Sequence, residues 1–532
     1  MQTTIAGWLE RAAREHPRAE ALVDMPSGRR LTYQELWELS GRAARGLLAL
    51  GLEPGDHLSL WAPNQPEWVI CQMAAALAGL VLTNVDTGID GPGLARLLSH
   101  SDCRVLVLAP GMEGGREFLD LLAGLDRSGF PELRCLVVLD QQAPEGMLSW
   151  PELLERGQEV PREELARRQA GLGPDEVACL FYTSGTTGPP KGVMTTHRGL
   201  MHTAWASARN QELDQASRLC VSVPLSHVFG CACLTLAALA VAAALVIPSR
   251  RPQAQASLEA VERESCTALY GAPTAFVEML ELQGQSPRDL GSLRTGIMAG
   301  AQCPLEVMRR VVEELGLAGI LVGYGQTEAS TWISQTRAQD PLELRVSTVG
   351  RPIEGVEVKI VDPASGRELE PGQVGELCTQ GFNMKGYYHQ PAATAQALDP
   401  EGWLHTGDLA SQDEQGYLRI VGRLKEVIRS GGRAIYPAQV EEVLYTHPAV
   451  GLAQVFGVPH PELGQEVAAW VKLEPGARAQ AGELLSWCAE RLEPGQVPVH
   501  LKLVDQFPMT SLGKIQKYRL SRLYARELGR EG

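Results

Sequence analysis

The sequence predicts an α/β protein of at least two domains, with mostly parallel sheets flanked by helices. The chain has 532 residues, which is more than one ordinary hydrophobic core holds. Segments with helical spacing alternate along it with short apolar runs that end in turn residues, an order typical of parallel sheets covered by helices. Near residue 425 the pattern changes, and a compact α+β unit follows. The predicted domains are residues 1–423 and 424–532.

The segment 31–52 predicts the first long helix. Thr32 and Glu35 have the spacing of a capping box, and apolar residues from Leu36 to Leu50 then recur at helical spacing before Gly51. Short apolar runs closed by turn residues predict strands at 57–63, 105–110 and 133–140.

The run from Cys231 to Ile247 is apolar apart from Thr235 and is barely long enough to span a membrane. Its high alanine content makes it only weakly hydrophobic. A buried helix that continues into a strand is therefore favoured over a membrane helix.

Charge and cysteine usage exclude several classes of protein. The formal net charge is −15, and no basic run is present, which argues against a nucleic-acid binder. The eleven cysteines include no CxxC pair, so a zinc site and a disulfide framework are both unexpected. Neither end of the chain resembles a targeting signal, and a reducing, cytoplasmic location is expected.

The stretch Tyr182–Gly192 reads YTSGTTGPPKG. The flanking residues predict a buried strand before it and a helix, 197–208, after it, so the loop is expected to join a strand to a helix. Glycines allow close backbone approach, hydroxyls can donate, and a lysine adds charge, which together suit a phosphate chain. The candidates are Thr183, Ser184, Gly185, Thr186, Thr187, Gly188 and Lys191. The spacing is not that of a Walker loop, and a plain turn is the alternative.

Four further motifs accompany this loop in order: YGQTE at 324–328, GWLHTGDLA at 402–410, GRLKEVIRSGG at 422–432 and PMTSLGKIQK at 508–517. Together the five resemble the motif set of the adenylate-forming, AMP-binding superfamily, and specifically its acyl-CoA synthetase branch. The resemblance covers essentially the whole chain. It implies a large N-terminal domain of α/β subdomains with a small β-barrel-like subdomain, and a small, mobile α+β C-terminal domain.

The implied chemistry explains these residue types. A carboxylate acylates poorly, whereas attack on the α-phosphate of ATP gives an acyl-adenylate whose leaving group is AMP. The protein must mainly position the reactants and neutralise phosphate charge. The resemblance therefore implies ATP, Mg²⁺ and coenzyme A as cofactors, and a small-molecule carboxylic acid as substrate.

The resemblance assigns nucleotide roles to residues of two motifs. Tyr324, with Gly325 beside it, would stack against adenine, Thr327 would hydrogen-bond the α-phosphate, and Glu328 would hold Mg²⁺. Asp408 can accept from two ribose hydroxyls. In isolation, the first group could be a turn with a helix cap and Asp408 a surface turn residue.

Further nucleotide and catalytic residues follow from the same resemblance. Arg423 would face the nucleotide, and Gly300 with Ala301 would line adenine and the acyl carboxylate, although a tight turn before a helix near Pro304 would look the same. Lys514 is the predicted catalytic lysine of adenylation.

The C-terminal domain is implied to serve two steps. Lys514 would serve adenylation, whereas Gly431 and Gly432 would let the pantetheine arm of coenzyme A pass. Both cannot face one site together, so a rotation about Lys425 as hinge is expected.

The acyl pocket is expected to draw on residues 223–233, 270–274 and 329–333. Residues 228–231 offer no anion for an α-amino group, and Trp332 shortens the pocket, which favours medium-chain over long-chain hydrophobic acids. His227 resembles a family residue that helps to gate the passage between the acyl site and the thiol tunnel. A helix-capping or merely buried histidine is the alternative. Two alternatives to a coenzyme A ligase remain open: transfer of the acyl group to an acyl carrier protein, and a non-catalytic nucleotide-binding protein. The protein is expected to be a monomer or a homodimer.

Overall fold

The computed structural model describes residues 4–112, 117–183, 190–301, 303–474, 476–508, 515 and 517–530. It divides into two compact units. The first comprises Met1–Glu357 and Thr379–Leu404, and the second Val358–Cys378 and His405–Gly532. This partition groups a small sheet with the C-terminal elements. The predicted boundary at 423/424 concerns where a mobile part begins, and it stays a prediction.

One sheet of the first unit has eight strands among the described residues. In spatial order they are β19 (Gly386–Tyr387), β9 (Lys191–Thr196), β8 (Val177–Thr183), β4 (Val81–Asn84), β3 (His57–Trp61), β5 (Cys103–Leu108), β6 (Cys135–Val138) and β7 (Leu148–Ser149). From β8 to β7 all neighbours are parallel, whereas β9 is antiparallel to both β8 and β19. The three strands predicted from apolar runs are confirmed as β3, β5 and β6.

A second sheet of this unit has nine strands within the described ranges. In spatial order they are β16 (Arg351–Pro352), β15 (Thr331–Gln335), β14 (Gly319–Gln326), β13 (Thr295–Ala299), β12 (Ala268–Gly271), β10 (Arg218–Cys220), β11 (Ala244–Ile247), β1 (Glu20–Asp24) and β2 (Arg29–Thr32). The strands from β14 to β1 pair in parallel, and both edges are antiparallel. The predicted class, mostly parallel sheets, is confirmed.

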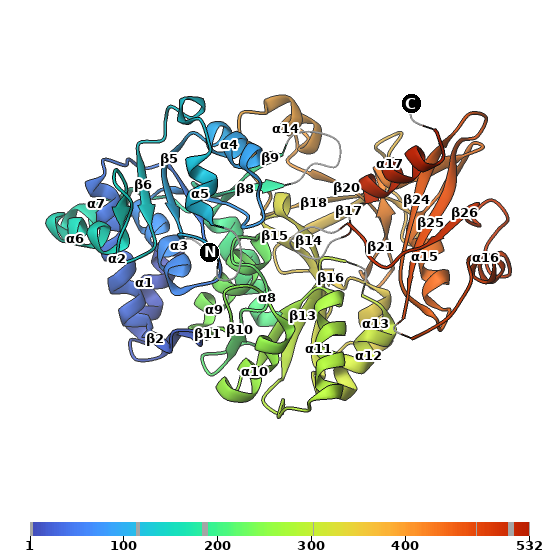
Figure 1. Cartoon of the computed structure of the whole chain (residues 1–532), viewed down its shortest axis with the longest axis horizontal. Coiled ribbons are helices and arrows are strands. Elements are labelled where there is room, and N and C mark those ends of the chain that lie inside the picture. The colour runs from blue at the N-terminus through green and yellow to red at the C-terminus, as the bar shows by residue number, and fades with distance from the viewer. Residues whose placement is uncertain are drawn as a thin grey trace. The chain divides into compact units, whose positions relative to one another are not determined.

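Helices accompany both sheets (Figure 1). They are α1 (Ile5–Glu15), α2 (Tyr33–Ala49), α3 (Pro66–Ala78), α4 (Gly91–His100), α5 (Phe118–Ala123), α6 (Trp150–Glu159), α7 (Arg162–Gly171), α8 (His197–Asn210), α9 (Thr235–Val241), α10 (Ala254–Glu264), α11 (Pro273–Gln285), α12 (Leu305–Glu314), α13 (Leu342–Ser347) and α14 (Pro391–Ala397), with short turns η1 (Arg127–Gly129), η2 (Phe229–Leu234) and η3 (Thr327–Ala329). The capping box predicted at Thr32 is confirmed, because its hydroxyl accepts from Glu35 N–H at 3.2 Å and the Glu35 carboxylate accepts from Thr32 N–H at 2.8 Å.

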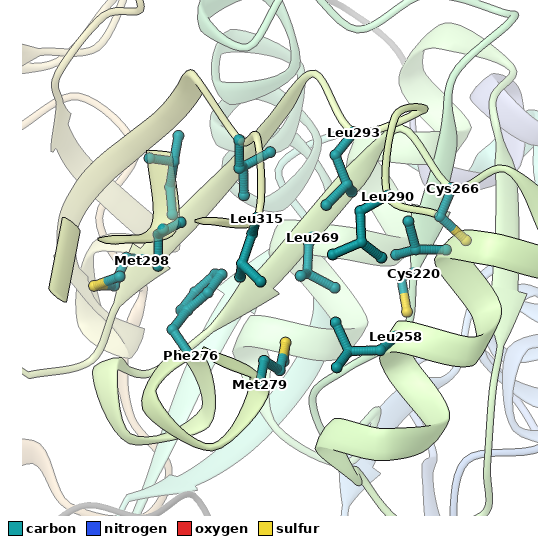
Figure 2. Close-up of a cluster of buried hydrophobic side chains, with 14 of the residues drawn as sticks. Cys220, Leu258, Cys266, Leu269, Phe276, Met279, Leu290, Leu293, Met298 and Leu315 are labelled. Carbon is teal, nitrogen blue, oxygen red and sulfur yellow. The ribbon is translucent and has the colours of Figure 1, made fainter. Parts of the chain in front are cut away.

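The helices α10, α11 and α12 cover the second sheet with an apolar layer (Figure 2). Phe276 of α11, Leu258 of α10 and Leu269 of β12 are fully buried in it. Burying side chains of this size stabilises the fold by about 1.5–3 kcal/mol each. The parallel strands that carry the candidate site are therefore held by a continuous core.

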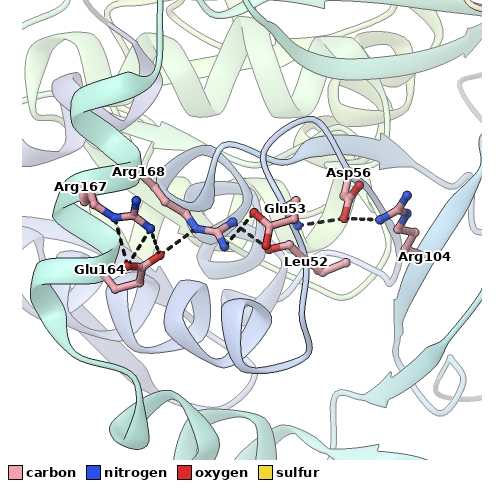
Figure 3. A network of polar contacts seen from close by, with 7 residues as sticks. All are labelled: Leu52, Glu53, Asp56, Arg104, Glu164, Arg167 and Arg168. Carbon is pink, nitrogen blue, oxygen red and sulfur yellow. Dashed lines mark hydrogen bonds and ion pairs between the residues drawn. The ribbon is translucent and has the colours of Figure 1, made fainter.

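A polar network fixes α7 beside the turn that leads into β3 (Figure 3). The Arg168 guanidinium donates to the Leu52 carbonyl at 2.7 Å and lies 3.1 Å from the Glu53 carboxylate. The Arg168 side chain is only 12% exposed, whereas Glu53 is 68% exposed, so the hydrogen bond to the Leu52 carbonyl fixes α7 more than the ion pair does.

The apolar segment 231–247 forms a buried helix that continues into a strand, as predicted. It runs through the π-helical turn η2, then α9, then β11. None of the helices in the described part of the chain is both long and apolar enough to cross a membrane.

The expected strand-to-helix loop is corrected by the structure. The residues after the loop, Lys191–Thr196, form β9, which pairs antiparallel with β8, and α8 begins only at His197. The loop therefore closes a hairpin. The strand is defined by its pairing with β8 and β19, since its burial does not alternate regularly, and no helix N-terminus follows the loop directly.

Packing between α2 and α6 depends on glycine. A Cβ on Gly46 would lie 2.3 Å from the Leu153 carbonyl oxygen, whereas a Cβ on Gly41, in the same helix, would meet nothing within 4 Å. We expect Gly46→Ala to lower the free energy of unfolding by about 1–3 kcal/mol through overpacking. Gly41→Ala should instead raise it by up to about 1 kcal/mol, because alanine favours a helix interior. Thermal unfolding of both variants checks this, and equal effects would contradict it.

The second unit contains two sheets among its described residues. The first has the order β17 (Glu357–Val361), β18 (Gly375–Gln380), β20 (Leu404–Gln412) and β21 (Leu418–Arg423). The resemblance implied a β-barrel-like subdomain of the N-terminal domain, whereas these strands form a four-stranded sheet that is grouped with the C-terminal elements. The second has the order β23 (Arg433–Ile435), β22 (Ile428–Ser430), β25 (Gly464–Leu473) and β24 (Val450–His460), with β26 (His500–Leu503) beside β25.

Three α-helices complete the described part of the second unit: α15 (Pro437–Tyr445), α16 (Ala481–Ala489) and α17 (Lys517–Glu527). A separate apolar core forms between the larger sheet, α15 and α16, and includes the fully buried Val440, Leu444 and Leu484. This core confirms the predicted α+β C-terminal part.

Candidate active site

The carboxyl ends of β13 and β14 lie side by side. These strands are parallel neighbours in which Ala299 is paired with Gly323, so Gly300 and Tyr324 follow at the same edge of the sheet. Gly300 has φ +90°, a left-handed conformation that favours glycine, and Gly300 and Ala301 are exposed. Ligands of open α/β sheets bind outside this edge. The structure therefore brings together three residues predicted to border adenine.

The chain turns sharply at the YGQTE motif, between the end of β14 and the start of β15. The pairing shifts between Tyr324 and Gly325, and a Cβ on Gly325 would lie 1.7 Å from the Thr331 carbonyl oxygen. Gly325 was predicted from its motif as a nucleotide contact. Its lack of a side chain is in any case required for this hairpin to form.

Thr327 and Glu328 lie on the 3₁₀ turn η3 that follows β14. Thr327 is buried, and Glu328 is half-buried. Just beyond them Ser330 and Thr331 have φ +52° and +102°. Such values are strained for residues with a Cβ, above all for a β-branched threonine, and strain of this kind is frequent at functional sites.

Glu328 has a partner that the sequence did not reveal. The Tyr387 hydroxyl donates to Glu328 Oε1 at 2.9 Å, and Lys191 Nζ lies 4.5 Å from the centroid of the same tyrosine ring. Burial, with the Glu328 carboxylate beside it, raises the pKa of Tyr387, so the phenol stays a donor. Tyr387 thus connects the lysine of the predicted phosphate loop with the predicted metal ligand. It lies 59 residues beyond Glu328, and no local pattern marks it.

The two ends of the predicted phosphate loop are paired across the hairpin, Thr183 with Lys191. Of the other predicted loop residues, Ser184, Gly185, Thr186, Thr187 and Gly188 lie outside the described residues. At the base of the loop, burial raises the pKa of Tyr182, whose hydroxyl is hydrogen-bonded to His100 Nδ1 at 2.8 Å.

His227 precedes the π-helical turn η2. Its Nδ1 accepts from the Phe229 backbone N–H at 3.1 Å, which is a local capping contact of the kind considered as the alternative to a gate. The gating role stays a proposal.

Three aromatic rings pack together within the predicted acyl region. Phe229 meets Trp332 edge to face, with centroids 5.8 Å apart, and Tyr270 in the same manner at 6.1 Å. The phenol of Tyr270 donates to Gln211 Oε1 at 2.8 Å. Trp332 is 4% exposed, and its indole nitrogen has no hydrogen-bond partner within the described structure. These contacts give the predicted pocket an apolar, aromatic wall.

The predicted ribose ligand of the second unit is buried and paired. Asp408 in β20 is 5% exposed, and Arg423 Nε of the neighbouring β21 lies 3.1 Å from its Oδ1. The two residues are directly opposite in the antiparallel pair. The structure thus brings together Asp408 and Arg423, as the resemblance implied. A buried carboxylate with an arginine partner can remain ionised to accept from hydroxyls.

Hydrogen bonds to residues of β18 hold the turn before Asp408 in place. The Thr406 hydroxyl donates to the Leu377 carbonyl at 2.6 Å and accepts from Asp408 N–H at 3.1 Å. Gly407 N–H donates to Glu376 Oε1 at 3.1 Å. Glu376 was not predicted as a functional residue, because its partners come some thirty residues later.

The remaining predictions in the second unit concern the predicted passage for the pantetheine arm of coenzyme A and the predicted hinge. Lys425 is exposed on the 3₁₀ turn η4 (Leu424–Glu426), between β21 and β22. Gly431 and Gly432 form the turn from β22 to β23, with φ +56° and +81°, conformations that suit glycine. Lys514 lies outside the described residues.

The parallel α/β sheets carry glycine, tyrosine and carboxylate groups at their carboxyl edge, and the second unit pairs buried Asp408 with the partly exposed Arg423. These features fit the class of enzymes that activate their substrate with a nucleotide. The chain belongs to the AMP-binding enzyme family. The family model described as AMP-binding enzyme matches residues 9–388, and the model of the AMP-binding enzyme C-terminal domain matches residues 439–514.

Several relatives are named acyl-CoA synthetases or ligases. The chain is 40% identical to the putative acyl-CoA synthetase YngI of Bacillus subtilis, over 98% of this chain and 97% of that protein. It is 33% identical to the mitochondrial medium-chain acyl-CoA ligase ACSF2 of Danio rerio, over 99% and 89%. Among solved structures, ATP-bound MatB from Rhodopseudomonas palustris superposes with a TM-score of 0.86 at 26% identity, over 98% and 99% of the two chains.

Proposed function

We propose that this protein joins a hydrophobic carboxylic acid, of medium-to-long chain length, to coenzyme A through an acyl-adenylate. The observation that carries the substrate class is the aromatic wall of Phe229, Tyr270 and Trp332, next to residues 228–231 that offer no charge to an ammonium group. An apolar acyl chain gains free energy by leaving water for such a surface.

Each unit carries residues predicted to serve the first half-reaction. In the first unit, Thr327 would donate to the α-phosphate and Tyr324 would lie against adenine, while Gly300 and Ala301 leave room for the acid carboxylate. In the second unit, Asp408 would accept from the ribose hydroxyls, and Lys514 would donate to the oxygen between carboxylate and α-phosphate. The acid carboxylate oxygen bonds to the α-phosphorus, and pyrophosphate leaves.

The residues around Glu328 suit Mg²⁺. The ion prefers oxygen ligands that it shares with phosphates, and the Glu328 carboxylate is oriented by the Tyr387 hydroxyl. When bound, Mg²⁺ would supply charge neutralisation at the phosphate oxygens. The predicted loop from Thr183 to Lys191 would hold the β- and γ-phosphates.

The second half-reaction follows a rotation about Lys425. Gly431 and Gly432 would then admit the pantetheine arm, and His227 would gate the passage between thiol and acyl group. The thiol sulfur bonds to the acyl carbon, AMP leaves, and the thiol proton goes to solvent. None of the eleven cysteines, all of which lie in the described residues, forms a disulfide, which suits the reducing cytoplasm in which we expect this protein.

The proposal is tested by the mass of the product. The purified protein is incubated with ATP, Mg²⁺ and a series of acids, together with either coenzyme A or a panel of phosphopantetheinylated carrier proteins. Acyl-CoA as the main product supports the proposal. Acylated carrier protein without acyl-CoA would show that the acceptor is a carrier protein and not coenzyme A. If no acid supports pyrophosphate exchange, the assignment as an enzyme is overturned.

Trp332 is expected to set the length of the acyl pocket. Its ring lies so close to β14 that a Cβ on Gly323 would be 2.6 Å from it, and it is fixed against Phe229. Trp332→Ala should shift the preferred acid toward longer chains and raise kcat/KM for them about tenfold relative to medium chains, because each added buried methylene contributes about 0.8 kcal/mol.

Trp205→Ala is the matched control, because Trp205 lies on α8 beside Arg209 and outside the three predicted pocket segments. The control should leave the chain-length profile unchanged. If Trp332→Ala leaves the chain-length profile unchanged, Trp332 does not belong to the pocket wall.

A further inference from the structure

Three potential metal ligands converge between two neighbouring strands of the second unit. Glu376 and Cys378 lie two positions apart on β18 and so point to the same face of the strand, and His405 lies on the adjacent β20. His405 Nδ1 is 2.9 Å from Glu376 Oε2 and 3.5 Å from Cys378 Sγ. All three donor atoms lie within 4.8 Å of one another.

A single ring nitrogen faces both partners. His405 Nδ1 can carry one proton, which it can direct fully to only one of the two groups. If Nδ1 carries no proton, its lone pair faces the carboxylate instead. One cation at the centre of the three atoms would interact favourably with the carboxylate, the sulfur and the ring nitrogen at once.

The spacing favours a borderline transition metal. With zinc bonds of about 2.3 Å to sulfur and about 2.0–2.2 Å to nitrogen and oxygen, tetrahedral ligands lie roughly 3.3–3.6 Å apart. The distances of 2.9 and 3.5 Å from His405 Nδ1 lie close to this range, and the carboxylate and the sulfur, within 4.8 Å of each other, can reach it by a small side-chain adjustment. Mg²⁺ takes oxygen ligands and is disfavoured by this set.

The surroundings hold the ligands in place. Glu376 Oε1 is fixed by Gly407 N–H at 3.1 Å, which leaves Oε2 directed at His405. Cys378 is fully buried, whereas the His405 side chain is 32% exposed. Ions and a fourth, water ligand can therefore approach from the histidine side. Orientation of a ligand by such an outer hydrogen bond is usual at metal sites.

We propose that Glu376, Cys378 and His405 form a binding site for a divalent transition metal of the Zn²⁺ class. On binding, the Cys378 S–H bond breaks, a sulfur–metal bond forms, and the thiol proton goes to solvent. His405 binds through Nδ1 and keeps its proton on Nε2. The metal links β18 to β20 three residues before Asp408. A search for CxxC spacing misses this site, because its ligands come from two strands 27 residues apart.

The test uses Co²⁺ as a spectroscopic probe on the metal-free, full-length protein. We expect one equivalent of Co²⁺ to produce the near-ultraviolet absorption of a cobalt–thiolate bond together with visible bands of a four-coordinate ion. Zn²⁺ should remove these bands by competition, and excess Mg²⁺ should not. Cys378→Ser should abolish the thiolate absorption, and Cys135→Ser, at a half-buried cysteine of the first unit, should retain it.

Serine at a fully buried position can lower stability, so a second variant keeps the test decisive. His405→Gln, at a partly exposed side chain, should weaken Co²⁺ binding at least about tenfold while its melting temperature without metal stays close to that of the parent. A folded parent protein without the thiolate absorption would overturn the proposal, as would absorption that survives in Cys378→Ser.

Discussion

Replacing Lys514 with alanine is expected to abolish acid-dependent exchange of pyrophosphate into ATP, with a loss of about 10²–10³-fold or more. Removing one donor aimed at developing charge in a water-poor site costs a factor of this size. The sequence SLGKI places Lys514 directly after Gly513, and its motif resembles the one that supplies the adenylation lysine. Exchange of labelled pyrophosphate with the preferred acid measures the effect.

Two comparisons separate this role from a general loss of charge or fold. Lys502→Ala removes another lysine of the second unit, whose Nζ pairs with Glu527 at 2.7 Å on the surface, and it should leave exchange nearly unchanged. The Lys514→Ala protein should still convert supplied acyl-AMP to acyl-CoA. Persistent exchange would show that another residue stabilises the first transition state.

Features with a local cause were predictable from the sequence. The helix at 33–49 is signalled by a cap whose two hydrogen bonds both lie within four residues, Thr32 to Glu35. The strands β3, β5 and β6 are short apolar runs with turn residues behind them. The run 231–247 is apolar because η2, α9 and β11 are all buried, and its length alone left a membrane helix open.

Features that depend on distant partners were not predictable. The strand β9 is not predicted by the sequence, because six residues beside a glycine-rich turn carry little periodicity and its strand character comes from pairing with β8 and β19. Tyr387 and Glu376 were missed for the same reason, since each contacts its site residue across 29 to 59 residues of sequence.

A residue in a motif can be required for ligand binding or for the backbone conformation, and the sequence alone does not distinguish the two. Gly325 belongs to the predicted nucleotide motif, yet the close approach of Thr331 already requires glycine there. His227 was predicted as a gate, and it also caps Phe229 N–H. Predicting a site residue from its motif is therefore most informative for side chains such as Asp408, whose burial and pairing no backbone requirement explains.

Asp408→Asn is expected to raise the KM for ATP by about 10–100-fold in pyrophosphate exchange. The substitution preserves shape but removes the charge that strengthens hydrogen bonds from ribose hydroxyls, and a hydrogen bond to a charged group contributes about 1.5–3 kcal/mol. It also removes the ion pair with Arg423, which is partly exposed and contributes little by itself. Asp413→Asn, a change of the same type at a turn of the same sheet, should alter KM less than about twofold.

Deoxynucleotides distinguish a ribose contact from a structural role of Asp408. If its carboxylate accepts from both hydroxyls, the parent enzyme should discriminate against 2′-deoxy-ATP and 3′-deoxy-ATP, and Asp408→Asn should lose most of that discrimination. The coupling between a protein change and a ligand change isolates the interaction, because a purely structural defect weakens all three nucleotides by the same factor. Undiminished discrimination in the variant would therefore assign ribose recognition to other residues and leave Asp408 as a brace for β20 and β21.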